Sequence, residues 1–305
     1  MPTSAPHRYL IVIAGPTASG KTETAVRLAA AYDTSVISAD ARQFYREIPI
    51  GTAAPTPEEF RIARHHFIGH LSIFDRMDAG LFADTTVELL ETLFLQTDHV
   101  ILCGGSGLFI RAVTEGLDTL PDVPAEIREQ VRALYSEHGL TRLQTEVQLR
   151  DPEHFARVDK QNPQRLMRAL EICLATGRTY SEFRAGNPVT RPFVSIKLCL
   201  DIPREELYAR IDARVDRMME AGLLEEARAV FAHRHLPALQ TVGYKELFDH
   251  FDGKYDLGTA IAHIKQHSRN YAKRQLTWFR NTGGYHMVHP QHIDAAYIEY
   301  LKSRL

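Results

Sequence analysis

A short apolar run that ends in a glycine-rich loop constrains this chain more than any other feature. Residues 9–14 read Tyr-Leu-Ile-Val-Ile-Ala, and residues 15–22 read Gly-Pro-Thr-Ala-Ser-Gly-Lys-Thr. The second stretch fits the pattern G-x-x-x-x-G-K-[ST] at every fixed position. Good helix formers follow over residues 23–31. The order strand, glycine loop, helix predicts an α/β fold with a P-loop and a parallel sheet flanked by helices.

The chemistry of this loop follows from its shape. Glycines allow a tight turn, so that successive backbone N–H groups and a helix N-terminus point at one anion. A lysine adds a point charge, and a threonine hydroxyl suits Mg²⁺. We therefore expect a di- or triphosphate to bind at Gly15, Pro16, Thr17, Ala18, Ser19, Gly20, Lys21 and Thr22, with Mg²⁺ as cofactor on Thr22.

Length and composition narrow the class of protein. A chain of 305 residues predicts about two domains. Its net charge of −2 gives no overall positive field that would attract nucleic acid. Cys103, Cys173 and Cys199 lie in apolar segments without CxxC spacing, which favours buried thiols in a reducing compartment. The residues before Tyr9 leave no room for a signal peptide, and no apolar stretch approaches the roughly 20 residues of a membrane helix. We expect a cytoplasmic monomer that does not bind membranes.

Two further strands are expected to end near the phosphate loop. Residues 35–40 form a β-branched run that ends in Asp40, and ligands of open α/β sheets bind beyond the carboxyl ends of strands. The alternative interpretation of Asp40, a helix cap or turn residue, is the less favoured of the two. A helix over 82–95 precedes a strand over 99–103, which runs into Gly104, Gly105 and Ser106. Many P-loop hydrolases carry an aspartate there, so its absence favours group transfer.

The middle of the chain has a different character. A proline-bearing linker near residue 120 leads into a helical pattern over 125–180, and residues 193–202 again predict a strand. We therefore expect a core of residues 1–118 and 193–305, which includes C-terminal helices, and an inserted helical domain over 119–192.

Basic side chains recur at helical spacing near the C-terminus. Arg210, Arg214 and Arg217 share one stripe, and Lys265, Arg269 and Lys273 share another within a stretch, 257–293, that contains no Asp or Glu. Aromatic residues lie among the second set. Solvated faces and contacts with an RNA backbone are both open interpretations.

Together, these blocks identify a resemblance. The chain resembles the tRNA dimethylallyltransferases, bacterial enzymes that prenylate N6 of adenosine 37, beside the anticodon of tRNA. The matching blocks are residues 15–22, 38–45, 50–53, 104–108, 162–171, 210–214, 242–244 and 272–278. The resemblance covers nearly the whole chain and implies dimethylallyl diphosphate as the donor, with diphosphate released.

The resemblance also implies roles for individual residues. Asp40 matches the general base that takes the proton from N6, and Ser106 and Arg214 match the groups that stabilise the leaving diphosphate. Matching positions imply tRNA contacts at Asp40, Ala41, Arg42, Gln43, Ser106, Arg128, Gln164, Arg165, Leu166, Met167, Arg168, Gln240, Thr241, Val242, Gly243, Tyr244 and Lys245. The charge pattern adds Lys273 and Arg274. Ala41 stands where the family usually has serine, and Ser106 where it usually has threonine.

Three other functions compete with this interpretation. An adenylate isopentenyltransferase would use the same donor on a free nucleotide, but it would leave the inserted domain without a role. A P-loop kinase of small molecules would bind ATP and release ADP. A non-enzymatic nucleotide sensor would leave Asp40, Ser106 and Arg214 unexplained.

Overall fold

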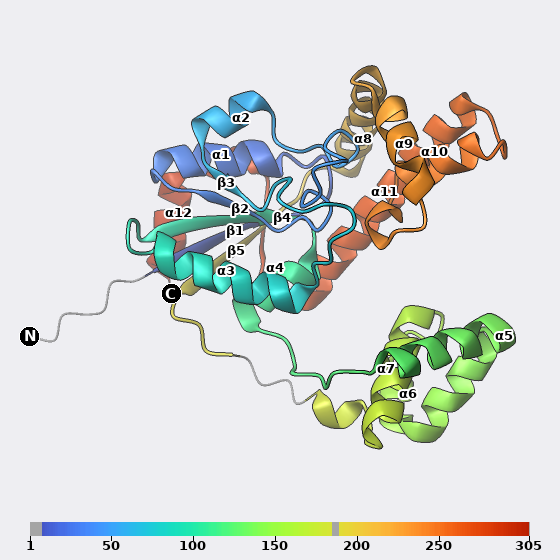
Figure 1. Cartoon of the computed structure of the whole chain (residues 1–305). Helices are drawn as coiled ribbons and strands as arrows, with labels where there is room; N and C mark the ends of the chain where they lie inside the picture. The colour runs from blue at the N-terminus through green and yellow to red at the C-terminus, as the bar shows by residue number, and fades with distance from the viewer. Residues whose placement is uncertain (1–7, 185–188, 305) are drawn as a thin grey trace, which may run out of the picture. The chain divides into compact units, whose positions relative to one another are not determined.

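The computed structural model describes residues 8–184 and 189–304. Its contacts divide the chain into two compact units, one formed by Met1–Glu115 with Thr190–Leu305 and the other by Gly116–Val189. The second unit lies close in sequence to the expected insertion, 119–192. We call these the core unit and the inserted unit, and describe each by itself (Figure 1).

A six-stranded parallel sheet forms the centre of the core unit, in the order β3-β2-β4-β1-β5-β6. The predicted strands are confirmed as β1 (Tyr9–Ala14), β2 (Val36–Ser38), β4 (His99–Gly104) and β5 (Val194–Leu200). Two short edge strands were not predicted, β3 (His65–His66) and β6 (His286–Val288). The register pairs Ala14 with both Gly104 and Cys199, so three strands end at one edge of the sheet.

Helices cover both faces of this sheet (Figure 1). On one face lie α1 (Lys21–Ala31), α2 (Pro57–Ile62) and α12 (Ala295–Lys302), and on the other α3 (Ala79–Leu93) and α4 (Gly107–Glu115). Alternate residues of β1 serve the two layers, because Leu10 and Val12 pack with α3 and α4 whereas Ile11 and Ile13 pack with α1 and α12. This three-layer arrangement buries β1 on both sides.

The C-terminal helices build a second apolar core beside the sheet. They are α8 (Arg204–Glu220), α9 (Leu223–Val230), α10 (Tyr244–Phe251) and α11 (Leu257–Thr282), with short 3₁₀ turns at Phe231–His233, Pro237–Leu239 and Pro290–His292. Leu223, Leu247 and Ile264 pack there against Tyr45 and Ile48 from the loop after β2. The helices therefore hold that loop against the sheet edge.

The inserted unit is entirely helical in its described part. It consists of α5 (Ala125–Arg150), α6 (Pro152–Arg157), α7 (Pro163–Thr176) and a 3₁₀ turn at Ser181–Phe183, with α5 kinked at Gly139. Val131, Val147, Leu166 and Leu170 share its core. The Asp151 carboxylate accepts hydrogen bonds from the backbone of His154 and Ser181, which ties the last turn to α6.

Two expectations from composition can be compared with this structure. Cys103, Cys173 and Cys199 are all buried and free, as predicted. In the described residues, no helix is long and apolar enough to cross a membrane.

The layer beneath α3 gives the first testable prediction. Phe82 is fully buried, and its ring stacks on Phe44 at 5.4 Å between centroids. Phe82→Ala should lower the free energy of unfolding by about 3–5 kcal/mol, because it removes buried apolar surface and leaves a cavity. The midpoint of urea unfolding measures this loss. Phe74→Ala is the control, because the Phe74 side chain is 61% exposed; equal effects of the two changes would contradict the proposed core.

Candidate active site

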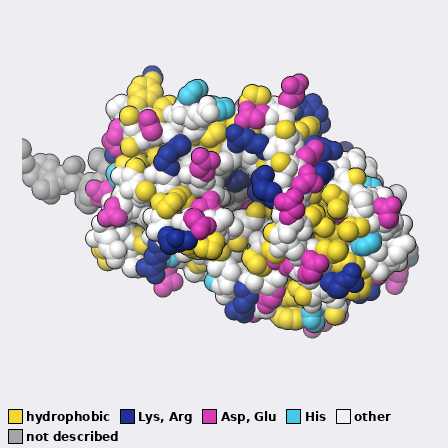
Figure 2. All heavy atoms as spheres, turned by 90° about the horizontal axis from the view of Figure 1, so that it is seen from above, with side chains coloured by type: hydrophobic (Ala, Val, Ile, Leu, Met, Phe, Trp, Pro, Cys, Tyr) yellow, Lys and Arg dark blue, Asp and Glu magenta, His cyan; other side chains and the backbone are white. Residues whose placement is uncertain are grey.

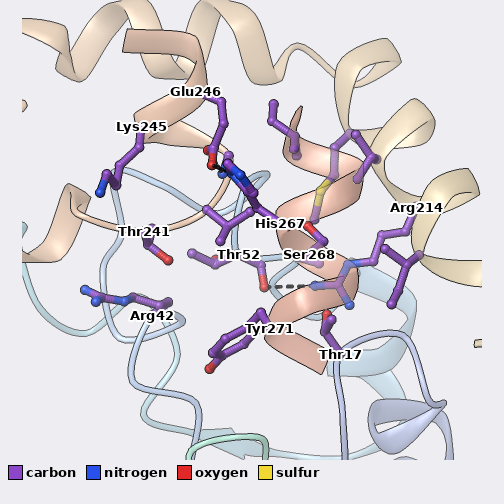
Figure 3. A pocket seen from close by; sticks show the side chains of 18 of the residues that line it. Thr17, Arg42, Thr52, Arg214, Thr241, Lys245, Glu246, His267, Ser268 and Tyr271 are labelled. Atoms are coloured by element: carbon purple, nitrogen blue, oxygen red, sulfur yellow. Dashed lines mark hydrogen bonds and ion pairs between the residues drawn. The ribbon is translucent and has the colours of Figure 1, made fainter. Parts of the chain in front are cut away.

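The loops that follow β1, β2 and β4 open into one cavity of about 780 Å³ in the core unit. Its wall includes Thr17, Lys21 and Thr22 from the P-loop and Asp40 from the end of β2. Helices α8, α10 and α11 close the other side (Figure 3). The sheet therefore brings the predicted phosphate loop and the predicted carboxylate to the same space, although α1 separates them in the sequence.

The P-loop has the backbone that its sequence predicts. Gly15 and Gly20 have φ values of 148° and 91°, a region that favours glycine. The Ser19 hydroxyl donates to the Pro16 carbonyl at 2.9 Å, which closes the turn from within. The first N–H groups of α1 have no intrahelical acceptor, so they and the loop amides form a cradle for an anion.

Lys21 is the cation of this cradle. Its ammonium donates to the Pro16 carbonyl at 2.7 Å, and burial lowers its pKa. Cys103 lies nearby on β4, where burial raises the pKa of the thiol to about 12 and keeps it neutral. Removal from water disfavours the charged lysine, and a bound diphosphate would favour it again.

Asp40 occupies a turn and also faces the cavity. One carboxylate oxygen accepts a hydrogen bond from the Arg42 N–H at 3.1 Å, so Asp40 does serve as a turn residue. The other oxygen has no hydrogen-bond partner among the described residues, and Asp40 lines the cavity. The turn thus fixes the carboxylate and leaves one oxygen to accept a proton.

Arg214 reaches the cavity from α8. Its guanidinium donates to the Thr52 carbonyl at 3.4 Å, as drawn in Figure 3. Burial lowers the pKa of Arg214, and the negative charge of Asp40 opposes that shift. An arginine remains charged at neutral pH, so Arg214 brings a permanent positive charge to the wall of the cavity.

Ser106 lies differently from the expectation. It is not part of the cavity wall; its hydroxyl accepts a hydrogen bond from the Ala41 N–H at 3.1 Å. In this structure it therefore orients the turn that carries Asp40. The hydroxyl proton stays available to an acceptor, because the bond to Ala41 uses only an oxygen lone pair.

Two polar residues that the sequence analysis did not select hold the loops around the cavity. The Glu226 carboxylate accepts hydrogen bonds from the N–H groups of Ile50 and Gly51, both at 2.8 Å, and from the Tyr244 hydroxyl. Gln275 on α11 contacts both the P-loop and the loop after β4. Of the two, only Gln275 lies in one of the matching sequence blocks, residues 272–278. Nothing in that block indicated that its side chain would bond to the two loops.

The predicted tRNA-binding residues of the core unit divide into two groups. The first group lines the cavity and consists of Arg42, Gln43, Gln240, Thr241, Val242, Gly243 and Lys245. Figure 3 shows Arg42, Thr241 and Lys245 together on one side of it. Tyr244 is fully buried, so its side chain is not available for the expected contact with tRNA. Its hydroxyl serves Glu226 instead.

The inserted unit requires a similar correction. Gln164 and Arg165, at the start of α7, are exposed. Leu166 and Met167 are buried in the core of the unit, so their side chains are not available to tRNA. Arg168 faces Glu171 at 3.5 Å, and Arg128 is partly buried. All five residues 164–168 of α7 were expected to contact tRNA, but only one face of this helical turn is exposed to solvent.

The basic stripe of α11 is shorter than its sequence suggests. Lys265 and Arg269 pair with Asp216 and Asp212 of α8, at 2.6 and 2.5 Å, so these two cations join helices. Lys273 and Arg274 are exposed, and Arg274 lines the cavity. Figure 2 shows a hollowed face on which basic and acidic side chains are interspersed, with Lys and Arg beside the hollow. A local basic rim replaces the long positive face.

The P-loop offers the hydroxyl of Thr22 as a ligand for a magnesium ion. Within residues 8–184 and 189–304, no group of three His, Cys, Asp or Glu side chains could hold a metal. Mg²⁺ commonly takes one or two protein oxygens together with substrate phosphates and waters. Thr22 in the cavity wall is suited to supply such an oxygen beside a bound diphosphate.

Comparisons with known proteins agree with this geometry. The model of the IPP transferase family matches residues 43–282. The chain is 45% identical over 293 residues to tRNA dimethylallyltransferase 1 of Bacteroides thetaiotaomicron, a match that covers 96% of this chain and 95% of the relative. It is 47% identical over 287 residues to the tRNA dimethylallyltransferase of Cytophaga hutchinsonii, covering 94% of each.

Two solved structures have the same fold. The full-length tRNA isopentenylpyrophosphate transferase of Bacillus halodurans aligns with a TM-score of 0.70 and 33% identity, over 97% of this chain and 95% of that one. A eukaryotic dimethylallyltransferase captured acting on tRNA aligns with a TM-score of 0.73 and 25% identity, over 89% of this chain and 69% of that one. From the family match and these relatives, the chain belongs to the IPP transferase family.

Proposed function

We propose that this chain transfers a dimethylallyl group from dimethylallyl diphosphate to N6 of adenosine 37 in tRNA and releases diphosphate. The observation that carries the proposal is one cavity walled by Lys21, Arg214 and Asp40, that is, by an anion cradle and a free carboxylate oxygen. The relatives named tRNA dimethylallyltransferase and the eukaryotic enzyme acting on tRNA support the acceptor.

The reaction needs a base because the adenine amine is a poor nucleophile. Its lone pair is delocalised into the ring, so the nitrogen must lose a proton as it bonds to carbon. In this step the N6–C bond forms, the allylic C–O bond breaks, and the bonding electrons of C–O go to the diphosphate oxygen. The free carboxylate oxygen of Asp40 takes the N6 proton.

The leaving diphosphate gains negative charge as the C–O bond breaks. Lys21, the amides at the start of α1 and Arg214 surround the place where that charge develops, and stabilising it lowers the barrier. Thr22 would hold Mg²⁺ together with diphosphate oxygens, and the ion would neutralise part of the charge. The Ser106 hydroxyl oxygen orients the Ala41 turn. Its proton is free to be donated to the leaving diphosphate.

The remaining surfaces suit the two substrates. Ile211, Val215 and Met218 give one stretch of the cavity wall an apolar character that fits a prenyl chain. The target base must leave its stack to enter the cavity, at a cost of a few kcal/mol. We assign contacts that offset this cost to Arg42, Gln240, Lys245 and Arg274 in the core unit, and to Gln164 and Arg165 in the inserted unit.

The setting of the enzyme is also a proposal. Free buried cysteines are compatible with the reducing cytoplasm, and we propose that the protein is a monomer. Sedimentation of the pure protein would show a single chain mass.

A transfer assay separates this proposal from its rivals. Purified protein, Mg²⁺ and labelled dimethylallyl diphosphate are offered unmodified tRNA with adenosine 37, free AMP, or ATP with a scan for ADP. Label on tRNA alone is the expected result. Label on AMP alone would identify an adenylate isopentenyltransferase, and formation of ADP would identify a kinase.

Asp40→Asn tests the base. Asparagine keeps an oxygen for the Arg42 N–H but cannot take a proton at neutral pH, so kcat should fall by about 10²–10⁴-fold. The dissociation constant for tRNA, measured by filter binding, should stay near the wild-type value. Asp33→Asn removes an exposed carboxylate elsewhere and should be silent. Wild-type turnover in Asp40→Asn would remove Asp40 from the mechanism.

Reversing the charges of Lys273 and Arg274 tests the basic rim. Both side chains are exposed, so Lys273→Glu with Arg274→Glu should weaken tRNA binding. The slope of log affinity against log salt should become shallower in proportion to the phosphates that the protein no longer neutralises. Arg304→Glu, an exposed change on the C-terminal segment, is the control. An unaltered salt slope in the double variant would show that Lys273 and Arg274 are solvated and do not contact tRNA phosphates.

A further inference from the structure

Gln275 joins two loops of the site through one side chain. It is only 7% exposed. Its amide oxygen accepts a hydrogen bond from the Thr17 N–H at 2.9 Å, and its amide nitrogen donates to the Gly105 carbonyl, also at 2.9 Å. Thr17 belongs to the P-loop and Gly105 to the loop after β4, so α11 is bonded to both.

The first of these bonds decides which amides are left for an anion. Pro16 has no N–H, and the Thr17 N–H is directed at Gln275. The Ser19 N–H is also engaged, because it donates to the Pro16 carbonyl at 3.4 Å. The cradle is therefore limited to the Ala18 amide and the amides of the first turn of α1. Fixing the start of the loop in this way sets where a diphosphate can rest.

The second bond leads toward the base. A Cβ atom at Gly105 would lie 2.3 Å from the Gln275 amide nitrogen, so only glycine permits this approach. The next residue is Ser106, whose hydroxyl accepts from the Ala41 N–H, and Ala41 follows Asp40 directly. A continuous set of bonds thus runs from the P-loop through Gln275 to the turn that carries the carboxylate.

We propose that Gln275 is a positioning residue that sets the distance between the donor diphosphate and the Asp40 carboxylate. This inference rests on the proposed function. A glutamine suits the task because it offers one donor and one acceptor at the same reach. Glutamate has no donor for the Gly105 carbonyl, methionine of similar length has neither group, and asparagine is one methylene too short.

The test compares Gln275→Glu and Gln275→Met with Gln266→Glu, an exposed change on the same helix. Gln275→Glu adds a negative charge beside the cradle, so the dissociation constant for inorganic diphosphate with Mg²⁺, measured by calorimetry, should rise by about tenfold or more. Gln275→Met leaves the charge unchanged but frees both loops, so kcat should fall by about tenfold or more while tRNA affinity stays within about twofold. Gln266→Glu should match the wild type in every measurement.

The outcomes separate this inference from the function on which it rests. Wild-type kcat and wild-type diphosphate affinity in both Gln275 variants would overturn the positioning role. A loss of tRNA affinity equal to the loss of kcat, with a lower melting temperature, would overturn it as well, because Gln275 would then serve only to hold α11 in place. A wild-type protein that transfers nothing to tRNA would instead overturn the proposed function.

Discussion

The parallel pairing of β1 with β4 and β5 is the constraint on which the site depends. Because the strands run the same way and end in register, the loops after them must meet at one edge of the sheet. β1 is followed by the anion cradle, and β4 by the glycines that allow close approach. β2 pairs in parallel with β4 and is followed by Asp40, so its carboxylate reaches the same edge. The shared edge is what brings Lys21 and Asp40 into one cavity.

The loops at this edge carry the chemistry but are long and polar, so side chains from distant helices must hold them. Gln275 binds the P-loop, Glu226 binds the loop at Ile50 and Gly51, and Arg42 donates to the carbonyls of Pro237 and Ala238. Each tie satisfies backbone groups that would otherwise be costly to bury. The C-terminal helices are therefore part of the active site even where they present no reacting group.

The sequence predicted what local spacing determines. The P-loop, its flanking strand and helix, and the placement of Asp40 at the cavity follow from motifs whose geometry is fixed by a few residues. The place of Arg214 in the cavity wall was implied by the family resemblance alone, because its spacing indicated only a shared helical stripe. The burial of Tyr244 could not be predicted in this way, because a matching block does not say which of its side chains face inward. The ion pairs of Lys265 and Arg269 depend on carboxylates of α8 that lie 49 and 57 residues away, and the short strand β6 is too brief to show periodicity.

The absence of an aspartate at the end of β4 has a physical meaning in this arrangement. A hydrolytic P-loop enzyme uses such a residue to hold Mg²⁺ or to position water. Here the strand ends at Gly104 and Gly105 follows it. The space beside these glycines is taken by the Gln275 amide and by the backbone of Ala39, which precedes Asp40. In the proposed mechanism the Asp40 carboxylate and the cradle have opposite roles in one cavity, because the first serves the incoming amine and the second serves the leaving anion. A fold often used to cleave a phosphate bond with water is thus fitted to move the carbon attached to the phosphate.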